Sequence, residues 1–331
     1  MENQTRLKQR RILCTGGSGF IGTHLIEHLL SCASGAILNL DIAKPKIIPH
    51  EKYWICINIL DREAIKRAFI YFQPTHLVHL AATTTMDGKS VRDYPVNVEG
   101  TDNVLNSAKS INSLQRILVA STQHVRRPGS GPARDDEDFD PYGAYGQSKV
   151  MTEQLTRNAH LRCCWTIMRP TAIWGPGHWG LAKGLWRLLG KGIYLHPRED
   201  QVIRSYGYVK NLVYQINAIL DASTDIVHES VYYGGDPPIR QIEWVNAFAE
   251  AITGMPVRTA PKWVLYSMAL AGEMAYRVGI PTPLYLSRYY NLITTNPVPT
   301  DKTATVFGLG HYSLNQGVQE TVSWLKTEGI I

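Results

Sequence analysis

A glycine-rich turn between a short apolar run and an amphipathic segment constrains the fold of this chain more than any other feature. Residues 11–15 (RILCT) form the apolar run, and Gly16, Gly19 and Gly22 follow before a segment with helical apolar periodicity. This order predicts a strand, a tight turn and a helix. Gly16 would let the chain turn, Gly19 would let a bound group approach the backbone, and Gly22 would let the helix pack closely on the strand.

The start of this helix is predicted to bind the phosphates of a dinucleotide. The first turn, which includes Phe20 and Ile21, has free N–H groups at the positive end of the helix dipole. A second predicted strand, 36–40, ends in Asp41, whose carboxylate can accept from both ribose hydroxyls of an adenosine. An acid there repels a 2′-phosphate and favours NAD, while the nearby Lys44 leaves NADP open.

Length and composition are those of a globular enzyme. The chain has 331 residues, of which 44% are hydrophobic and 27 are glycine, and this suits one large α/β domain with a smaller appendage. No apolar run reaches about 18 residues, so we expect no membrane span. Residues 1–10 lack the apolar core of a secretory signal, and the five cysteines form no C-x-x-C pair. A cytoplasmic protein with reduced thiols is expected.

The net charge of +6 is compatible with an anionic ligand. Basic residues are spread along the chain and do not cluster, so nucleic acid is not expected as a partner. The acidic run 135–138 lies in a predicted surface loop, and consecutive loop carboxylates are usually solvated. No metal site is therefore predicted.

Strand and helix patterns alternate along the first half of the chain. Further strands are predicted at 53–57, 75–80, 116–122 and 163–168, and helices after Asp61, at about 90–110 and at 142–160. This alternation predicts an α/β fold with a doubly wound parallel sheet of the Rossmann type. We expect 1–175 to form the nucleotide-binding domain, with some later elements returning to it, and 176–331 to form mainly a substrate-binding lobe.

Ligands of such sheets bind at the carboxyl ends of the strands. There, Asn58 and Ile59 are placed to face an adenine, and the small Ala81 and Ala82, followed by Thr83, leave room for a cofactor. Asn97 precedes a glycine inside a predicted helix. Either the helix tolerates that glycine, or Asn97 carries a polar link behind the site.

Tyr145 and Lys149 are four residues apart on a predicted helix, so both side chains can point into one site. A nearby ammonium favours the ionised form of a phenol and brings it toward use as a base. A hydroxyl from the end of the fifth strand would complete the arrangement. Ser121 and Thr122 are the candidates, and Thr122 is preferred.

The chain resembles the extended short-chain dehydrogenase/reductases that act on nucleotide sugars. The resemblance rests on TGGSGFIG, HLAATT, NVEGT, VASTQHV, YGQSK, RPTAIWGPG and RSYGYVKN, and it reaches to about residue 211. It implies an NAD-dependent enzyme of the epimerase/dehydratase type found in bacterial polysaccharide synthesis. Thr122, Tyr145 and Lys149 then match the catalytic triad, which disfavours a non-catalytic nucleotide sensor.

The family's reactions differ in the residues after the catalytic Ser/Thr. Dehydratases and decarboxylases of the family carry acids there, whereas this chain has Gln123 and His124. Dehydration is therefore disfavoured, although His124 leaves it open as a base. The resemblance favours a nucleotide-sugar epimerase that acts at C4 by removing and returning one hydride. The alternatives are an NAD(P)-dependent keto-sugar reductase and a 3β-hydroxysteroid-type dehydrogenase.

The resemblance also implies further ligand contacts. Pro170 and Ile173 would line the nicotinamide, Thr85, Gln123 and His124 would contact the substrate, and Arg204 and Arg288 would reach the diphosphate of a nucleotide sugar, with UDP favoured. RPTAIWGPG lacks an asparagine that many nucleotide-sugar epimerases carry. Residues 287–300 and Asp301 resemble the family's final strand and helix start. A homodimer is expected by analogy.

Overall fold

The structure, a computed structural model, describes residues 10–131, 133–198 and 201–331. Residues 1–9, where no secretory signal is expected, lie outside that range. The chain forms two compact units: unit 1 contains Met1–Thr171, Val209–Gly235 and Thr300–Gly310, and unit 2 contains Ala172–Tyr208, Asp236–Pro299 and His311–Ile331. The chain leaves unit 1 after Thr171 and returns to it twice. The expected functional division at residue 175 stays a prediction.

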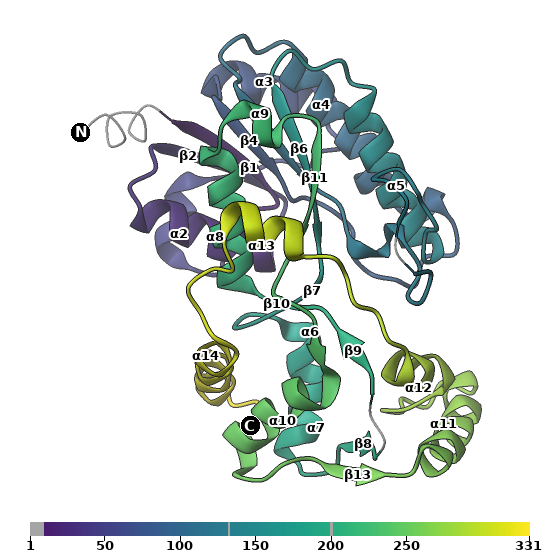
Figure 1. Cartoon of the computed structure of the whole chain (residues 1–331). Coiled ribbons are helices and arrows are strands. Elements are labelled where there is room, and N and C mark those ends of the chain that lie inside the picture. The colour runs from purple at the N-terminus through teal and green to yellow at the C-terminus, as the bar shows by residue number, and fades with distance from the viewer. Residues whose placement is uncertain (1–9, 132, 199–200) are drawn as a thin grey trace. The chain divides into compact units, whose positions relative to one another are not determined.

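Unit 1 is built on a seven-stranded sheet in which every neighbouring pair is parallel. Its order is β11-β6-β5-β4-β1-β2-β3 (Figure 1). The strands are β1 (Arg11–Thr15), β2 (Ala36–Asp41), β3 (Trp54–Cys56), β4 (His76–His79), β5 (Arg116–Ala120), β6 (Cys164–Pro170) and β11 (Ser230–Gly234). The strand order reverses between β1 and β4, and such a switch point opens a crevice at the carboxyl ends.

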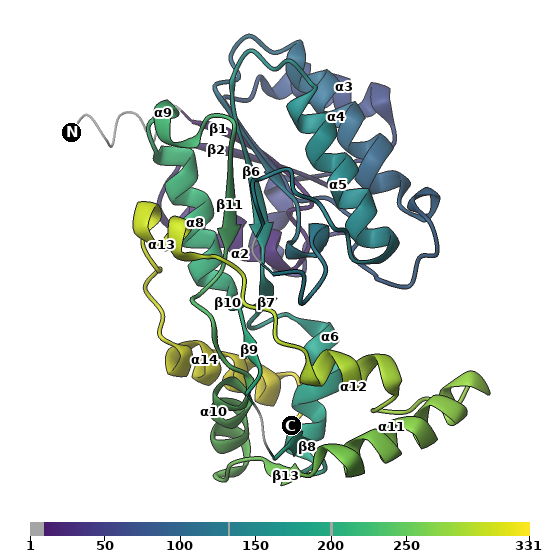
Figure 2. The ribbon, with the colours of Figure 1, turned by 45° about the vertical axis from the view of Figure 1, so that its right-hand side comes forward.

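Helices cover both faces of this sheet. Helices α3 (Arg62–Phe72), α4 (Thr101–Lys109) and α5 (Gly143–Arg157) lie together on one face, and α2 (Phe20–Ser31) and α8 (Val209–Asp221) lie together on the other (Figures 1 and 2). Parallel strands need crossover connections, and helices that pack back on the sheet supply them. The predicted doubly wound Rossmann-type fold is confirmed.

Local sequence accounts for these elements. Strands β1 and β5 are mainly apolar runs, and β4 has two apolar residues between two histidines. All three bury side chains on both faces, as expected of a sheet covered twice. The predicted cap at Asp61 is confirmed, because its carboxylate accepts a hydrogen bond from the Ala64 N–H at 2.9 Å. The core of unit 1 lies between the sheet and α3 and α4 and includes Leu13, Leu77 and Ile117, none of which is accessible to solvent.

The glycine turn after β1 holds the backbone close to its neighbours. Gly16 has φ +76°, and a Cβ on it would lie 2.6 Å from the amide nitrogen of Ala81. A Cβ on Gly22 would lie 2.3 Å from the carbonyl oxygen of Gly16. At Gly19, by contrast, a Cβ would meet only that same oxygen, at 3.2 Å. Gly16 therefore serves both the turn and close packing, Gly22 serves close packing, and Gly19 is less tightly enclosed than either.

Unit 2 combines three two-stranded pairings with several helices. The pairs are β7 (Ala172–Trp174) with β10 (Tyr206–Tyr208), β8 (Leu195–Pro197) with β13 (Arg258–Ala260), and β9 (Ile203–Arg204) with β12 (Ile239–Arg240). The helices include α6 (Trp179–Leu181), α7 (Arg187–Gly190), α10 (Gln241–Thr253) and α14 (Leu314–Thr327). Its interior is aromatic, since the Trp174 ring centroid lies 4.9, 5.9 and 5.2 Å from those of Tyr208, Trp244 and Phe248.

Two sequence-based expectations are wrong in detail. Residues 287–300 do not form a strand, because α12 (Leu286–Ile293) is a helix, while α13 (Asp301–Phe307) begins where a helix was expected. The helix expected at 90–110 is divided into a 3-10 turn (Val91–Asp93), a π-helical turn (Val96–Gly100) and α4. A Cβ on Gly100 would lie 2.6 Å from Ile59, so close packing at this glycine accompanies the irregular turn.

Helix α11 (Lys262–Arg277) has apolar residues on two faces. Leu265 and Ala269 are buried in a small cluster with Tyr289 of α12. Trp263 and Met274, on the other face, are 72% and 70% exposed. Among the described residues, no helix is both long enough and apolar enough to cross a membrane.

We predict that Gly22→Ala lowers the free energy of unfolding by about 1–3 kcal/mol, because the new methyl group would press on the Gly16 carbonyl. Gly184→Ala is the matched control, since no heavy atom lies within 4 Å of a Cβ there. Calorimetric unfolding of both variants measures the difference. Equal stability of the two variants would contradict the packing argument.

Candidate active site

The end of β5 and the face of α5 bring the predicted catalytic residues together in unit 1. The Thr122 hydroxyl lies close enough to the Tyr145 phenol to lower the pKa of that phenol by hydrogen bonding. Both side chains are buried, at 6% and 8% exposure. Helix α5 can approach this closely because Gly146 has no side chain: a Cβ there would lie 2.4 Å from the carbonyl oxygen of His124. The structure thus pairs Thr122, rather than Ser121, with Tyr145.

Lys149 lies one turn further along α5 and is 3% exposed. Its ammonium donates a 2.7 Å hydrogen bond to the Ala120 carbonyl oxygen. Burial lowers the pKa of Lys149 to about 8, and the Glu153 carboxylate opposes that fall. In turn, burial and the Lys149 charge lower the pKa of His79 on β4 to about 3, so His79 is neutral.

The pKa of Tyr145 differs from the sequence-based expectation. Burial raises this pKa, the hydrogen bond with Thr122 lowers it, and Tyr94 raises it. The expected lowering by Lys149 is not found in this structure, because the ammonium is directed at the Ala120 carbonyl and the phenol is desolvated. A cationic group bound beside the ring would oppose the effect of burial.

The glycine turn carries a cradle suited to a dinucleotide. The Gly17 N–H donates to Asn39 Oδ1 at 2.9 Å, and the Ser18 N–H donates to Asp41 Oδ2 at 3.0 Å. These bonds hold the Asp41 carboxylate beside the start of α2, where lone pairs remain for ribose hydroxyls. Lys44 forms an ion pair with Glu51 at 2.9 Å. The absence of a side chain at Gly19 and the acid at Asp41 fit NAD.

Asn39 is a supporting residue that the sequence analysis missed. It is fully buried, and its amide also donates to the Ser18 hydroxyl at 3.0 Å. The signal was present as the one polar residue inside the apolar run AILNL of the second strand.

The two predicted adenine contacts are placed differently from one another. Asn58 is exposed, and its carboxamide oxygen accepts from the Leu60 N–H at 3.0 Å. Ile59 is 4% exposed and belongs to the core, beside Gly100. The Ile59 side chain fills the space that Gly100 leaves. Its contact with an adenine stays a prediction.

Asn97 carries the polar link that was one of two alternatives. It is fully buried, its Oδ1 accepts from the Thr83 N–H at 2.8 Å, and its Nδ2 donates to the Ser148 hydroxyl at 2.9 Å. These bonds join the loop after β4 to helix α5. Ala81 and Ala82 begin that loop and are half-buried.

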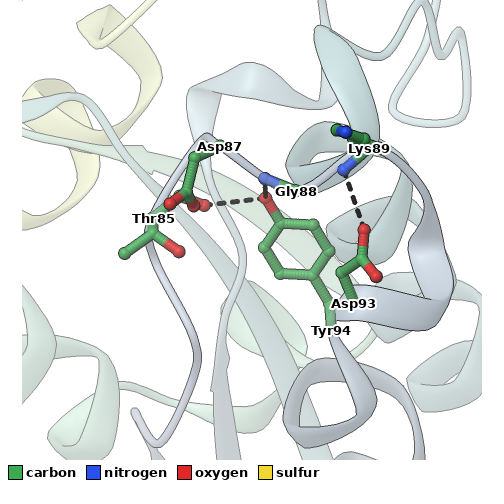
Figure 3. A pocket seen from close by; sticks show the side chains of 6 residues that line it. All are labelled: Thr85, Asp87, Gly88, Lys89, Asp93 and Tyr94. Atoms are coloured by element: carbon green, nitrogen blue, oxygen red, sulfur yellow. Dashed lines mark hydrogen bonds between the residues drawn. The ribbon is translucent and has the colours of Figure 1, made fainter. Parts of the chain in front are cut away.

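The same loop encloses a hollow of about 290 Å³ lined by Thr85, Asp87, Gly88, Lys89, Asp93 and Tyr94 (Figure 3). The Tyr94 phenol donates to the Thr85 carbonyl oxygen at 2.8 Å and accepts from the Gly88 N–H at 3.2 Å. Its ring centroid lies 6.0 Å from that of Tyr145. Polar groups of the loop thus lie near the Tyr145 phenol.

Gln123 and His124 form a short turn directly after Thr122. The His124 ring lies 6.2 Å, between centroids, from the Tyr145 ring. Gln123 Oε1 is buried and has no hydrogen-bond partner in the structure. The turn therefore places an amide and an imidazole beside Thr122 and Tyr145, and no carboxylate occupies either position.

The remaining predicted residues divide between the units. Pro170 ends β6 in unit 1, and Ile173 lies in β7 of unit 2. In unit 2, the Arg204 guanidinium donates to the Asn291 and Thr294 carbonyl oxygens at the end of α12. Arg288 is exposed and donates to the Pro283 carbonyl at 2.9 Å. Both arginines are thus engaged with backbone oxygens.

The acidic loop residues are used in ion pairs. Asp138 pairs with Arg126 and Arg134, each at 3.0 Å. In the described part of the chain, no cluster of three or more His, Cys, Asp or Glu side chains could hold a metal. All five cysteines are described, and none is in a disulfide.

The fold and site define an α/β enzyme class that holds a dinucleotide at a glycine turn and places a Thr-Tyr-Lys group at the same sheet edge. The sequence profile of the NAD dependent epimerase/dehydratase family matches residues 12–233. The chain therefore belongs to this family, and its cofactor is NAD.

Known relatives include enzymes of two kinds. N-acetyl-alpha-D-glucosaminyl-diphospho-ditrans,octacis-undecaprenol 4-epimerase of Escherichia coli O157:H7 is 28% identical over 61% of this chain, and the match spans 60% of that enzyme. Sterol-4-alpha-carboxylate 3-dehydrogenase erg26, decarboxylating, of Schizosaccharomyces pombe is 23% identical over 94% of this chain and 96% of that enzyme. Among solved structures, UDP-glucose 4-epimerase of Thermus thermophilus in complex with NAD has a TM-score of 0.69 and 23% identity over 96% and 99% of the two chains.

We predict that Asn97→Ala lowers the free energy of unfolding by about 1–3 kcal/mol, since it leaves the Thr83 N–H without its buried partner. Asn106→Ala removes an exposed amide that bonds Asp102 and should change stability by less than about 0.5 kcal/mol. Urea titration compares them. Similar losses in both would show that the link is not structural.

We predict that Lys149→Met stabilises the chain near neutral pH. The folded-state pKa of about 8 lies below the ordinary 10.5, so between those values the unfolded chain binds more protons and stability rises with pH. Below this window the buried ammonium of the unchanged chain destabilises the fold by up to about 3 kcal/mol. The variant gains this amount and loses the hydrogen bond to the Ala120 carbonyl, so its net gain is smaller. The advantage of the variant should disappear by about pH 10. Unfolding titrations across pH measure it, with the exposed Lys191→Met as control.

Proposed function

We propose that this chain is an NAD-dependent nucleotide-sugar epimerase that acts at C4, with Tyr145 as the acid and base. The observation that carries the proposal is the buried Thr122–Tyr145 pair with Lys149 one turn away, followed by Gln123 and His124 where a dehydratase would need acids. Such a site can move a hydroxyl proton, but the two positions that follow Thr122 offer no carboxylate for elimination of water.

Each residue has a role in this proposal. NAD supplies the hydride acceptor, and the glycine turn and Asp41 hold its phosphates and ribose. Tyr145 takes the proton of the substrate hydroxyl and later returns it, while the Thr122 hydroxyl stabilises the phenolate that forms. Lys149 contributes a buried positive charge, which strengthens electrostatic stabilisation because water is excluded. Pro170 and Ile173 are proposed to line the nicotinamide.

The substrate would be a nucleotide sugar, with UDP favoured. Thr85, Gln123 and His124 are proposed to contact the sugar, and the unpaired Gln123 Oε1 is suited to accept from a sugar hydroxyl. Arg204 and Arg288 are proposed phosphate contacts, which requires that their guanidinium N–H groups serve phosphate as well as the backbone. The E. coli relative is named for a sugar linked through diphosphate to undecaprenol, which supports a diphosphate-linked sugar but not the nucleotide. The nucleotide is suggested by the structural similarity to a UDP-glucose 4-epimerase. A cytoplasmic homodimer completes the proposal.

A second candidate is a net oxidoreductase, either a keto-sugar reductase or a dehydrogenase of a steroid-like alcohol. It is favoured by the match to a sterol dehydrogenase over 94% of this chain. The exposed apolar face of α11 is also compatible with an apolar substrate. The Thr-Tyr-Lys group supports both reactions, so the fate of the hydride separates them.

Purified protein incubated with UDP-glucose, UDP-N-acetylglucosamine and their uronic forms tests the proposal. An epimerase yields the C4 epimer with no net change in nicotinamide absorbance. Stoichiometric formation of NADH with any alcohol substrate would favour the oxidoreductase. A product other than the C4 epimer, formed without net production of NADH, would overturn only the assignment of the reaction to C4.

We predict that Tyr145→Phe lowers turnover by about 10²–10⁴-fold, because no other group in the pair can accept the hydroxyl proton. Tyr142→Phe is the matched control, since Tyr142 precedes the same helix and its ring also lies beside His124. Its turnover should stay within about twofold of the unchanged chain. Initial rates at saturating substrate measure both. Retained turnover in Tyr145→Phe would remove Tyr145 from the mechanism.

A further inference from the structure

Three successive residues at the end of β5 each bind one residue on the same face of α5. The Thr122 hydroxyl bonds the Tyr145 phenol, the Ala120 carbonyl accepts from the Lys149 ammonium, and the Ser121 hydroxyl donates to Glu153 at 2.5 Å. The three α5 residues are spaced by four, so they form one stripe along the helix. Of these three α5 residues, Tyr145 and Lys149 belong to the catalytic group described above, and Glu153 does not.

Glu153 is the third member of this stripe and is fully buried. Its carboxylate binds the Arg169 guanidinium at two points, each 2.8 Å long. Arg169 is 1% exposed, and it also donates to the Tyr233 hydroxyl at 3.0 Å and to the Asp136 carbonyl oxygen at 2.5 Å. Buried ion pairs of this kind contribute little net stability compared with apolar residues of similar volume.

We propose that Glu153 is a positioning residue that keeps Lys149 charged and in place, through its position one helical turn from Lys149 and its bond to the strand residue beside Ala120. The inference rests on the proposed function for its catalytic meaning. The charge state of Lys149 can be measured whether or not that function is correct.

The groups that face Lys149 support this role. His79 on β4 is neutral, Ala120 on β5 offers a carbonyl oxygen, and Tyr145 on α5 is a phenol with a raised pKa. Glu153 is the carboxylate that raises the pKa of Lys149 against burial. Since that pKa is only about 8, loss of the carboxylate would lower it toward neutral pH and increase the neutral fraction of the amine.

Glu153→Gln tests the proposal because it keeps the shape of the side chain and removes its charge. The titration midpoint of Lys149 should fall by about one pH unit or more. It can be followed by NMR with ¹³Cε-labelled lysine, and the signal absent from Lys149→Met identifies the residue. Glu153→Asp keeps the charge and should hold the midpoint close to that of the unchanged chain.

Removal of Glu153 also leaves the buried Arg169 charge unpaired, so the single variant is expected to be less stable. The double variant Glu153→Gln/Arg169→Met removes both charges and should recover most of the lost stability. Because it restores no carboxylate near Lys149, its Lys149 midpoint should stay low. Recovery of the midpoint together with stability would overturn the proposal and leave Glu153 as the counterion of Arg169 alone.

Activity gives a second readout. In both charge-removing variants the alkaline limb of the kcat–pH profile should move to lower pH, while KM changes less than about twofold, because Glu153 touches no substrate. An unchanged limb in folded protein would overturn the role of Glu153. If the chain shows no epimerase activity at all, the proposed function fails, but the NMR titration still decides the inference.

Discussion

The contact between the end of β5 and helix α5 is the interaction on which the site depends. A loop carbonyl at His124 reaches the helix only because Gly146 lacks a side chain. This approach brings the hydroxyl of Thr122 to Tyr145 and the carbonyl of Ala120 to Lys149. A bulkier helix start would separate the strand end from the phenol, even though every catalytic residue remained in the sequence.

Burial of this contact makes the site costly in stability. Lys149 and Glu153 are charged groups removed from water, and His79 and Asn97 are buried polar groups that need hydrogen bonds to be tolerated. The Asn97 bonds to Thr83 and Ser148 meet that need on the side of the loop after β4. The same burial means that charges in this water-excluded site act on one another more strongly than they would at the surface.

Much of the fold followed from local patterns. The strand at 11–15, the cap at Asp61 and the start of α13 were predicted from apolar runs, a capping residue and the resemblance, because such signals lie within a few residues of each other. The turn expected at Gly16 and the close packing expected at Gly22 are both present, as the positive φ of Gly16 and the crowding around Gly22 show. The irregular turn at 96–100 was visible only as a glycine in a helix, and its cause, the Ile59 side chain, comes from another segment.

The sequence by itself determined the alternation of strands and helices, the glycine turn and the placement of Tyr145 and Lys149 on one face of a helix, because these depend on the periodicity and spacing of nearby residues. The tertiary structure decided which hydroxyl meets Tyr145, that Ile59 turns into the core, and that Glu153 and Arg169 pair beneath the site. Those outcomes depend on the distances between segments that lie far apart in the chain, and no local pattern contains those distances.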